Sequence, residues 1–293
     1  MKPSSLSWII LMVLSIVWGS SFILMKEGMK AFNSDEVAAL RIAVAFIFLS
    51  PFLIKQFSKI HWQKNWKGLI LMGVCGNFIP AFLFTKAETQ ISSSLTGMLN
   101  ALTPLFTVLL GALLFKTKIQ KFQLIGVAVG LIGAVFLLGF GESNEQTKNM
   151  LYSLLVVGAT FSYAISVNGI RKYLHEINSF TAAVGAFAFI GPIAIVYLFV
   201  NTDFQNHLMN SPRGFCAFGY ICILAIAGTA LAVIIFNQLI KQAGTVFASS
   251  CTYLIPIVAI GWGLLDGEPI SLLQIFSMGI IILGVWIINK KSQ

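Results

Sequence analysis

Long stretches without a charged side chain restrict the fold of this chain more than any other feature. Nine intervals of at least 18 residues contain no Asp, Glu, Lys or Arg. A helix needs about 20 apolar residues to cross the roughly 30 Å of hydrocarbon in a bilayer. A tenth interval, 42–54, reaches that length when it is extended through Arg41 to Asp35. The predicted helices are 7–26, 35–54, 67–85, 92–115, 121–140, 149–171, 179–200, 213–236, 245–265 and 271–289.

The composition excludes most soluble classes of protein. Hydrophobic residues make up 57% of the chain and charged residues only 10%, against about 25% charged residues in soluble domains. A cytosolic enzyme, a disordered chain and a secreted disulfide scaffold are therefore excluded. We predict an all-α integral membrane protein whose ten helices form two inverted five-helix repeats.

The basic residues predict both a partner and an orientation. A net charge of +9 suggests nucleic acid in a soluble chain, but basic loops beside membrane spans face anionic headgroups. We therefore expect the lipid bilayer, and no nucleic acid, as partner. Thirteen of the 19 Lys and Arg residues fall on the side of the termini, and five on the other side. Because positive loops stay inside, we predict both termini on the cytoplasmic side of the cell membrane.

No cofactor or metal site is predicted. The four cysteines lie in apolar stretches without a CxxC pair, and the three histidines are far apart. Small buried side chains are the ordinary role of such cysteines. The sequence also has no catalytic cluster inside a span and no GxxxxGK[ST] loop for ATP. We therefore predict neither an enzyme nor an ATP-driven pump.

The two halves of the chain, 1–141 and 149–293, align with each other. Trp18-Gly19 falls on Tyr163-Ala164 at an offset of 145 residues, and Gly76-Asn77 falls on Gly228-Thr229 at an offset of 152. Five helices per half would place the second half in the membrane upside down, an arrangement typical of secondary transporters. Duplication for packing alone, as in some channels and membrane enzymes, is the alternative.

Five segments of the chain carry a resemblance to a known family. They are Trp18-Gly19-Ser20-Ser21-Phe22, Ala38-Ala39-Leu40-Arg41, Leu102-Thr103-Pro104, Leu254-Ile255-Pro256 and Gly267-Glu268-Pro269. With these segments the chain resembles the EamA-domain transporters of the drug/metabolite transporter superfamily. The first half departs from the family pattern at Lys116-Thr117-Lys118, where a glutamate is usual. The loss of this turn element puts little of the function in doubt.

This resemblance implies a ten-helix carrier with a central cavity between the repeats. The first, third, fourth, sixth, eighth and ninth helices would line the cavity. The fifth and tenth helices would lie at the periphery, where a homodimer would form. Relatives of this kind move amino acids, metabolites, drugs or nucleotide-sugars, so the resemblance leaves the cargo open.

Polar and aromatic side chains near the middle of the lining helices are the candidate substrate contacts. Polar groups in hydrocarbon are costly and usually face the interior of the bundle. Each of them would serve equally well as a contact between helices. The predicted substrate-binding residues are Trp18, Ser21, Asn77, Asn100, Tyr163, Ser166 and Tyr253.

Two prolines occupy equivalent positions in the two halves. Pro104 and Pro256 each fall inside a predicted helix, where proline removes a hydrogen bond and bends the helix. We predict that they act as hinges, with a static bend as the alternative.

Charged residues are sparse inside the predicted spans. Arg41 and Lys26 lie near the predicted outer vestibule, where they would pair with a neighbouring carboxylate such as Glu27, Asp35 or Glu36, or attract an anionic group. Because no Asp, Glu or His lies near mid-membrane, we expect no obligatory proton site in the core. Those three acids and Glu88 cluster near the outer helix ends, which leaves proton antiport open.

Together these features predict a secondary transporter, acting as an exporter of small metabolites. Amino acids or related polar and amphipathic compounds would be its substrates, and alternating access around the central cavity its mechanism. The alternatives are a proton-coupled drug or metabolite antiporter and, from another class, a channel or a membrane-embedded enzyme.

Overall fold

The computed structural model describes residues 4–139, 146–249 and 251–289 of the 293. Within these ranges the chain forms helices and turns and no strand. Eight of its helical stretches are long and apolar enough to cross a membrane, and two shorter apolar helices, Cys251–Leu265 and Leu272–Ile288, accompany them. The predicted fold class, an all-α membrane protein of about ten helices, is confirmed.

Most of the ten predicted spans correspond to one continuous helix or to two consecutive helical pieces. The first half contains α1 (Ser5–Gly19), α2 (Ser21–Gly28), α3 (Ser34–Gln56), α4 (Trp62–Ile70), a π-helical segment (Leu71–Phe78), α5 (Ile79–Glu88), α6 (Ser93–Asn100), α7 (Thr103–Phe115) and α8 (Lys121–Gly139). The second half contains α9 (Gln146–Tyr173), α10 (Ser179–Asn201), α11 (Phe204–Asn210), α12 (Gly214–Ala225), a π-helical segment (Ile226–Leu231), α13 (Ala232–Ser249), α14 (Cys251–Leu265) and α15 (Leu272–Asn289).

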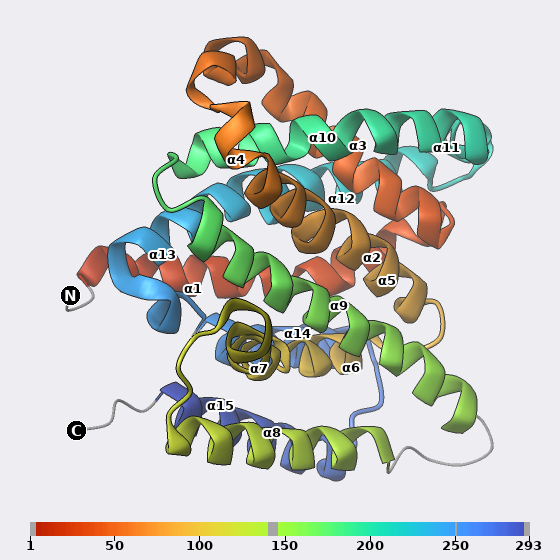
Figure 1. The fold of residues 1–293 in the computed structure, drawn as a ribbon. Coiled ribbons are helices and arrows are strands. Elements are labelled where there is room, and N and C mark those ends of the chain that lie inside the picture. The colour runs from red at the N-terminus through yellow and green to blue at the C-terminus, as the bar shows by residue number, and fades with distance from the viewer. Residues whose placement is uncertain (1–3, 140–145, 250, 290–293) are drawn as a thin grey trace.

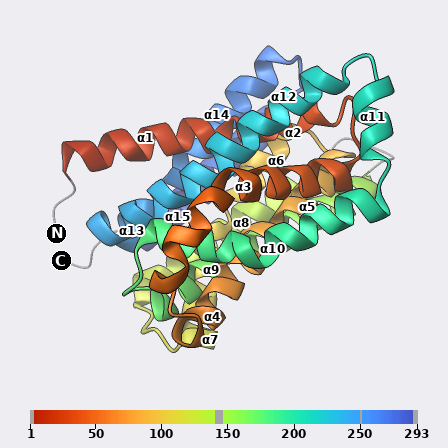
Figure 2. The same cartoon turned by 90° about the horizontal axis from the view of Figure 1, so that it is seen from above.

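The helices form layers that interleave the two halves (Figure 1). At one edge α8 of the first half packs along α15 of the second half, and at the other edge α3 packs along α10. Seen from above, α3 and α10 run side by side on the near face (Figure 2). A β-carbon at Gly284 would collide with backbone atoms of Gly126 and Gly130, so small residues allow α8 and α15 to approach closely.

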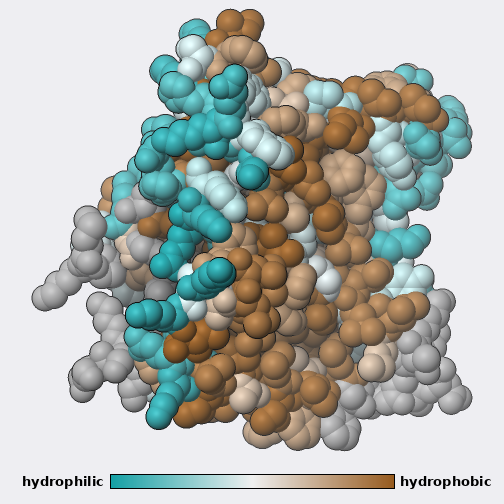
Figure 3. Space-filling view, in the orientation of Figure 1, coloured by the Kyte–Doolittle hydropathy of each residue, from teal (hydrophilic) through white to brown (hydrophobic). Residues whose placement is uncertain are grey.

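The outer surface of the bundle is suited to lipid. In Figure 3 a broad hydrophobic band separates two hydrophilic ends. Large apolar side chains such as Ile125, Val135 and Phe276 are more than half exposed. In lipid this exposure carries no hydrophobic cost, because acyl chains are as apolar as the side chains.

One predicted boundary is wrong. The spans predicted at 213–236 and 245–265 leave a connection around Lys241, whereas the structure continues α13 to Ser249 and begins the next helix at Cys251. A lysine near the end of a span need not end the helix, because its long stem can carry the ammonium group to the interface. The 201–212 connection also contains a short helix, α11, that the sequence did not predict.

The two prolines predicted as hinges lie in different local structures. Pro104 stands in the first turn of α7, after α6 has ended at Asn100. Pro256 lies inside the continuous helix α14. Proline is well tolerated in a first turn, where its missing N–H has no intrahelical partner. Hinge motion at these positions stays a prediction.

Helix α1 begins and α15 ends at the same end of the bundle, which we call the terminal end (Figure 1). The α5–α6 and α14–α15 connections lie at the other end, called the opposite end.

The predicted orientation places the terminal end in the cytoplasm. In a background whose native cysteines are replaced by alanine, an impermeant thiol reagent added to intact cells should label Asn206→Cys on exposed α11 and spare Gln63→Cys on α4. The reverse labelling pattern would contradict the orientation.

Candidate functional site

A cavity lies between the two halves, with about 930 Å³ of space free of protein atoms when open solvent is included. Its wall is mainly apolar, with a few polar side chains from both halves. Six of the seven side chains predicted to bind substrate line it: Trp18, Ser21, Asn77, Asn100, Tyr163 and Ser166.

Tyr253 does not line this cavity. Its hydroxyl donates a hydrogen bond of 2.5 Å to the carbonyl of Val285 on α15. The sequence places Tyr253 near the middle of a predicted span. The side of α14 that faces the cavity instead carries Cys251, Thr252 and Ile255. Its phenol therefore joins two helices in this conformation.

The two π-helical segments form matching parts of the wall. Asn77 donates a hydrogen bond of 2.9 Å to the carbonyl of Met72, and Thr229 donates one of 3.2 Å to Leu224, each five residues back. The indole of Trp18 donates to the carbonyl of Gly228 at 3.0 Å. A π-helical turn displaces carbonyls from the α-helical ladder and is frequent at functional sites. The aligned pairs Gly76-Asn77 and Gly228-Thr229 thus occur in the same unusual backbone geometry.

Aromatic rings enclose the cavity from both halves. Trp18 packs edge-on against Phe236 at a centroid distance of 4.9 Å, and Tyr163 lies 5.8 Å from Phe84. Such pairs are stabilised by about 1 kcal/mol beyond area burial. They form an apolar wall for the hydrocarbon part of a ligand.

Arg41 is the one cavity residue with a permanent charge among the described residues. It is 8% exposed, and its Nε donates a hydrogen bond of 2.7 Å to the hydroxyl of Thr229. None of the ion pairs among the described residues includes it. A buried guanidinium without a carboxylate partner is costly, so this position favours an anionic ligand group.

The expected pairing of Arg41 with a neighbouring acid is not observed. Glu27 pairs with Lys30, and Asp35 accepts a hydrogen bond from Tyr197. Glu36 caps its own helix by accepting the backbone N–H of Asn33 at 2.8 Å, and it also contacts His207 at 2.9 Å. Lys30 and Asn33 each lie three residues from the acid that they contact, whereas Tyr197 and His207 come from distant segments.

Asn237 is a lining residue that the sequence did not predict. It is 3% exposed, and its Oδ1 atom has no hydrogen-bond partner among the described residues. The predicted span ends at 236, which leaves Asn237 in a loop. The signal in the sequence that could have indicated a lining residue is a single asparagine next to an apolar run. Its free carbonyl oxygen can accept a hydrogen bond from a ligand amine.

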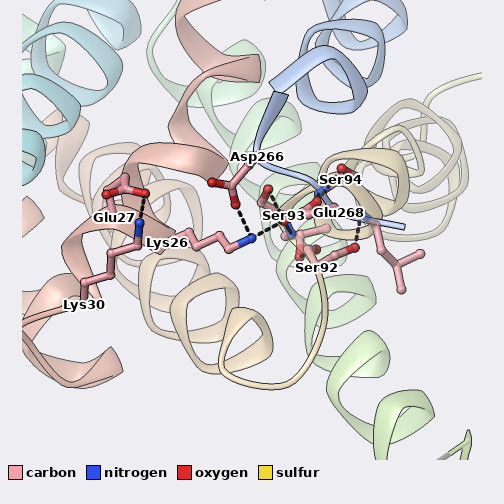
Figure 4. Close-up of polar contacts among 10 residues, drawn as sticks. Lys26, Glu27, Lys30, Ser92, Ser93, Ser94, Asp266 and Glu268 are labelled. Carbon is pink, nitrogen blue, oxygen red and sulfur yellow. Dashed lines mark hydrogen bonds and ion pairs between the residues drawn. The ribbon is translucent and has the colours of Figure 1, made fainter. Parts of the chain in front are cut away.

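A carboxylate joins the two halves at the opposite end. Lys26 lies 2.5 Å from Asp266 and 2.7 Å from Glu268. Glu268 also accepts hydrogen bonds from the backbone N–H and hydroxyl of both Ser93 and Ser94, at 2.5 to 3.1 Å (Figure 4). We call these five residues the clasp. Lys26, predicted near an outer vestibule, is therefore an ion-pairing residue between the halves.

The clasp holds Glu268 in its ionised form. Burial alone would raise the pKa of this carboxyl, but the hydrogen bonds from Lys26, Ser94 and Ser93 outweigh burial and lower the pKa to about 2. Two of the donors are backbone N–H groups in the first turn of α6, where the helix dipole also favours an anion. The clasp is thus a strong electrostatic contact between α2, α6 and the α14–α15 turn.

The aligned position of the first half has a different side chain. An offset of 152 residues places Lys116 where Glu268 lies in the second half. Lys116 adopts a left-handed backbone conformation with φ of 56° at the end of α7. Since Lys116 has no carboxylate, it cannot reproduce the contacts that Glu268 makes with the first turn of α6.

Comparison with known proteins decides the family. The sequence model of the EamA-like transporter family matches residues 6–139 and again residues 150–290. The chain belongs to the EamA-like transporter family. The division of the chain into two repeats and the inverted orientation of the second half stay predictions.

Relatives of this EamA-like chain are named as transporters. It is 27% identical to the uncharacterized inner membrane transporter YedA of Escherichia coli, over 95% of this chain and 89% of that protein. It is 24% identical to an S-adenosylmethionine/S-adenosylhomocysteine transporter of Chlamydia trachomatis, over 95% and 87%. It is also 24% identical to a "Probable amino-acid metabolite efflux pump" of Salmonella typhimurium, over 93% and 91%.

A solved crystal structure shares the fold of the EamA-like chain. The TM-score is 0.64 at 17% identity, over 97% of this chain and 96% of the other. The fold is therefore one that occurs in an experimental structure.

Proposed function

We propose that this protein is a secondary transporter that exports small metabolites, with amino acids or closely related compounds as substrates. The observation that carries the proposal is the cavity between the halves, with a buried Arg41 in its wall that has no carboxylate partner among the described residues. Family membership supports transport. Two relatives whose names include an amino-acid metabolite and S-adenosylmethionine support a small polar cargo.

The chemistry of the cavity fits a ligand with three parts. Arg41 would bind a carboxylate, for which its planar donors are well matched. The free Oδ1 of Asn237 would accept a hydrogen bond from an amine. The aromatic walls around Trp18 and Tyr163 would contact an apolar side chain. A carboxylate, an amine and an apolar group together describe an amino acid.

Transport would proceed by alternating access. The clasp closes the opposite end in this conformation, and several cavity residues, including Met72, Ile170 and Asn237, come from the helix portions nearer the terminal end. The bound ligand would be released after the clasp separates and the terminal end closes.

The second candidate function is that of a proton-coupled antiporter. The buried position of Glu88 favours this function.

Flux through liposomes tests transport and the role of the cavity. Comparing metabolites inside and outside cells with and without the protein would first identify the cargo. In liposomes, the uptake of the cargo should saturate as its concentration rises. Uptake should also be faster when cargo is present on the trans side. A channel would not show this behaviour. Trp18→Ala should reduce the exchange rate about tenfold by removing a wall of the cavity. The amount of inserted protein should be nearly unchanged.

Tyr253→Phe is the matched control for Trp18→Ala. It removes only a hydroxyl that bonds to Val285, outside the cavity, so exchange should continue at nearly the normal rate. If Trp18→Ala lowered folded protein and exchange in proportion, Trp18 would be a packing residue and not a substrate contact.

A further inference from the structure

Glu88 is a buried acid that neither the cavity nor the clasp uses. It is the last residue of α5, one helical turn beyond Phe84, which lines the cavity. The residue is 9% exposed, and both carboxyl oxygens are fully buried. Neither oxygen has a hydrogen-bond partner among the described residues. The isolated carboxyl thus lies between the cavity and the clasp.

The charged groups that act on Glu88 are Glu268, Lys26 and Arg41. The cations among them already have other partners. Lys26 is held between Asp266 and Glu268, and Arg41 donates its Nε to Thr229. Glu268 repels an ionised Glu88.

None of the described uncharged neighbours of Glu88 donates a hydrogen bond to it. The neighbouring helix α6 contributes Ser93 and Ser94, whose N–H and hydroxyl groups are donated to Glu268. Helix α9 contributes Tyr163, which packs on Phe84 one turn away. An ionised carboxylate without a hydrogen bond is far more costly to bury than a neutral carboxylic acid. The surroundings therefore favour the protonated form.

We propose that Glu88 is a proton-binding site that links protonation to the opening of the opposite end. The carboxyl holds its proton while the clasp is closed. When the clasp separates, water reaches the carboxyl, its O–H bond breaks, and the proton passes to that water. Lys26, freed from the clasp, and Arg41 then stabilise the anion. Acidity at this end consequently favours the closed form. This inference rests on the alternating access proposed above.

The site differs from the sequence-based expectation of no proton site in the core. Glu88 lies just beyond the predicted span 67–85, where a carboxylate would ordinarily meet water. The packing of α2, α3, α6 and α9 against α5 buries it instead.

Infrared difference spectroscopy on the full chain in lipid bilayers tests the site with the proton itself as ligand. At neutral pH the wild type should show the C=O stretch of a protonated carboxylic acid, and Glu88→Gln should lack it. Glu88→Asp, which keeps a carboxyl group, should shift the band and provides the test if the glutamine variant does not fold. Glu27→Gln is the matched control, because Glu27 already pairs with Lys30, and it should leave the band unchanged.

A second variant tests the link to opening. Ser93→Ala combined with Ser94→Ala removes hydroxyl donors from the clasp without changing the net charge. In this double variant the band should disappear at a pH about one unit lower, a tenfold change in proton affinity. Identical wild-type and Glu88→Gln spectra would overturn the site, and an unchanged titration in the double variant would overturn the link to opening. Neither measurement needs cargo, so a failure of the proposed transport remains distinguishable.

Discussion

Arg41→Met is expected to abolish transport without reducing the amount of folded protein. Arg41 is buried in the cavity wall without a carboxylate partner among the described residues. Losing a buried charged contact to a ligand typically costs 2–5 kcal/mol, or at least about a 30-fold loss of affinity. Methionine is apolar and has a comparable length, so removing an uncompensated buried charge should leave the free energy of unfolding unchanged or increased.

The measurement is exchange in liposomes, combined with the melting temperature of the purified variant. Arg41→Lys is the matched control, because it keeps the charge but loses the planar fork, and it should retain partial activity. The two variants should also discriminate less between an amino acid and its decarboxylated amine, since the carboxylate has lost its partner. Normal exchange in Arg41→Met would show that Arg41 does not bind the cargo.

Glu268→Ala is expected to destabilise the protein by about 3 kcal/mol at neutral pH, because removing one partner of a buried ion pair typically costs 3–5 kcal/mol. The variant leaves the N–H groups of Ser93 and Ser94 without an acceptor and Lys26 with only Asp266. The side chain of Glu268 is 4% exposed, so solvent screens these contacts little. Thermal unfolding in detergent measures the effect.

The same residue gives a pH dependence with a definite sign. The pKa of Glu268 is lowered to about 2 in the folded protein, against about 4.3 in an unfolded chain. Its stabilisation, roughly 3 kcal/mol, is therefore complete above the unfolded pKa and is lost as the pH falls toward the folded pKa. The difference between wild type and Glu268→Ala should accordingly shrink between about pH 4 and pH 2.

Glu176→Gln is the control for the Glu268 prediction. Lys64 lowers the pKa of Glu176 as well, through a hydrogen bond and charge, but both side chains are more than half exposed. Water and salt screen such a pair, so the melting temperature should barely change. Equal effects of the two substitutions would contradict a special role for the clasp.

The fold could be predicted from the sequence because lipid imposes a simple rule on each span. About 20 residues without charge predict a helix, and little else satisfies the backbone in hydrocarbon. The rule is weakest at helix ends, as Lys241 shows: the α13 helix continues past it to Ser249. Backbone hydrogen bonds continue to form in the interface, where a charge is no longer excluded.

The sequence predicts those residues of the candidate site whose position along a helix determines the direction of the side chain. It does not predict the others. Helix position placed Trp18, Asn77 and Asn100 in one cavity. It failed for Tyr253, whose hydroxyl donates to the carbonyl of Val285 on α15 instead of lining the cavity. It also missed Asn237, because the predicted span ends at 236 whereas α13 continues to Ser249.

Long-range partners account for the rest. Glu268 lies 175 positions from Ser93, and no local pattern indicates that the two meet. The contact of Arg41 with Thr229 and the burial of Glu88 likewise follow from packing between distant helices. The π-helical turns at Asn77 and Thr229 depend on hydrogen bonds five residues apart, which hydrophobic periodicity does not report.

In the proposed alternating-access cycle, the unequal turns at Lys116 and Glu268 would have a kinetic consequence. A carrier whose two end-closures differ in strength spends unequal times in its two conformations. The apparent affinity at either face is the intrinsic affinity reduced by the fraction of carrier facing that way. Because the clasp stabilises one conformation, the half-saturation concentrations on the two sides of the membrane should differ. The cargo gradient that is reached at equilibrium should be unaffected. The working concentration range on each side would then be set by one glutamate and the two serines that it joins.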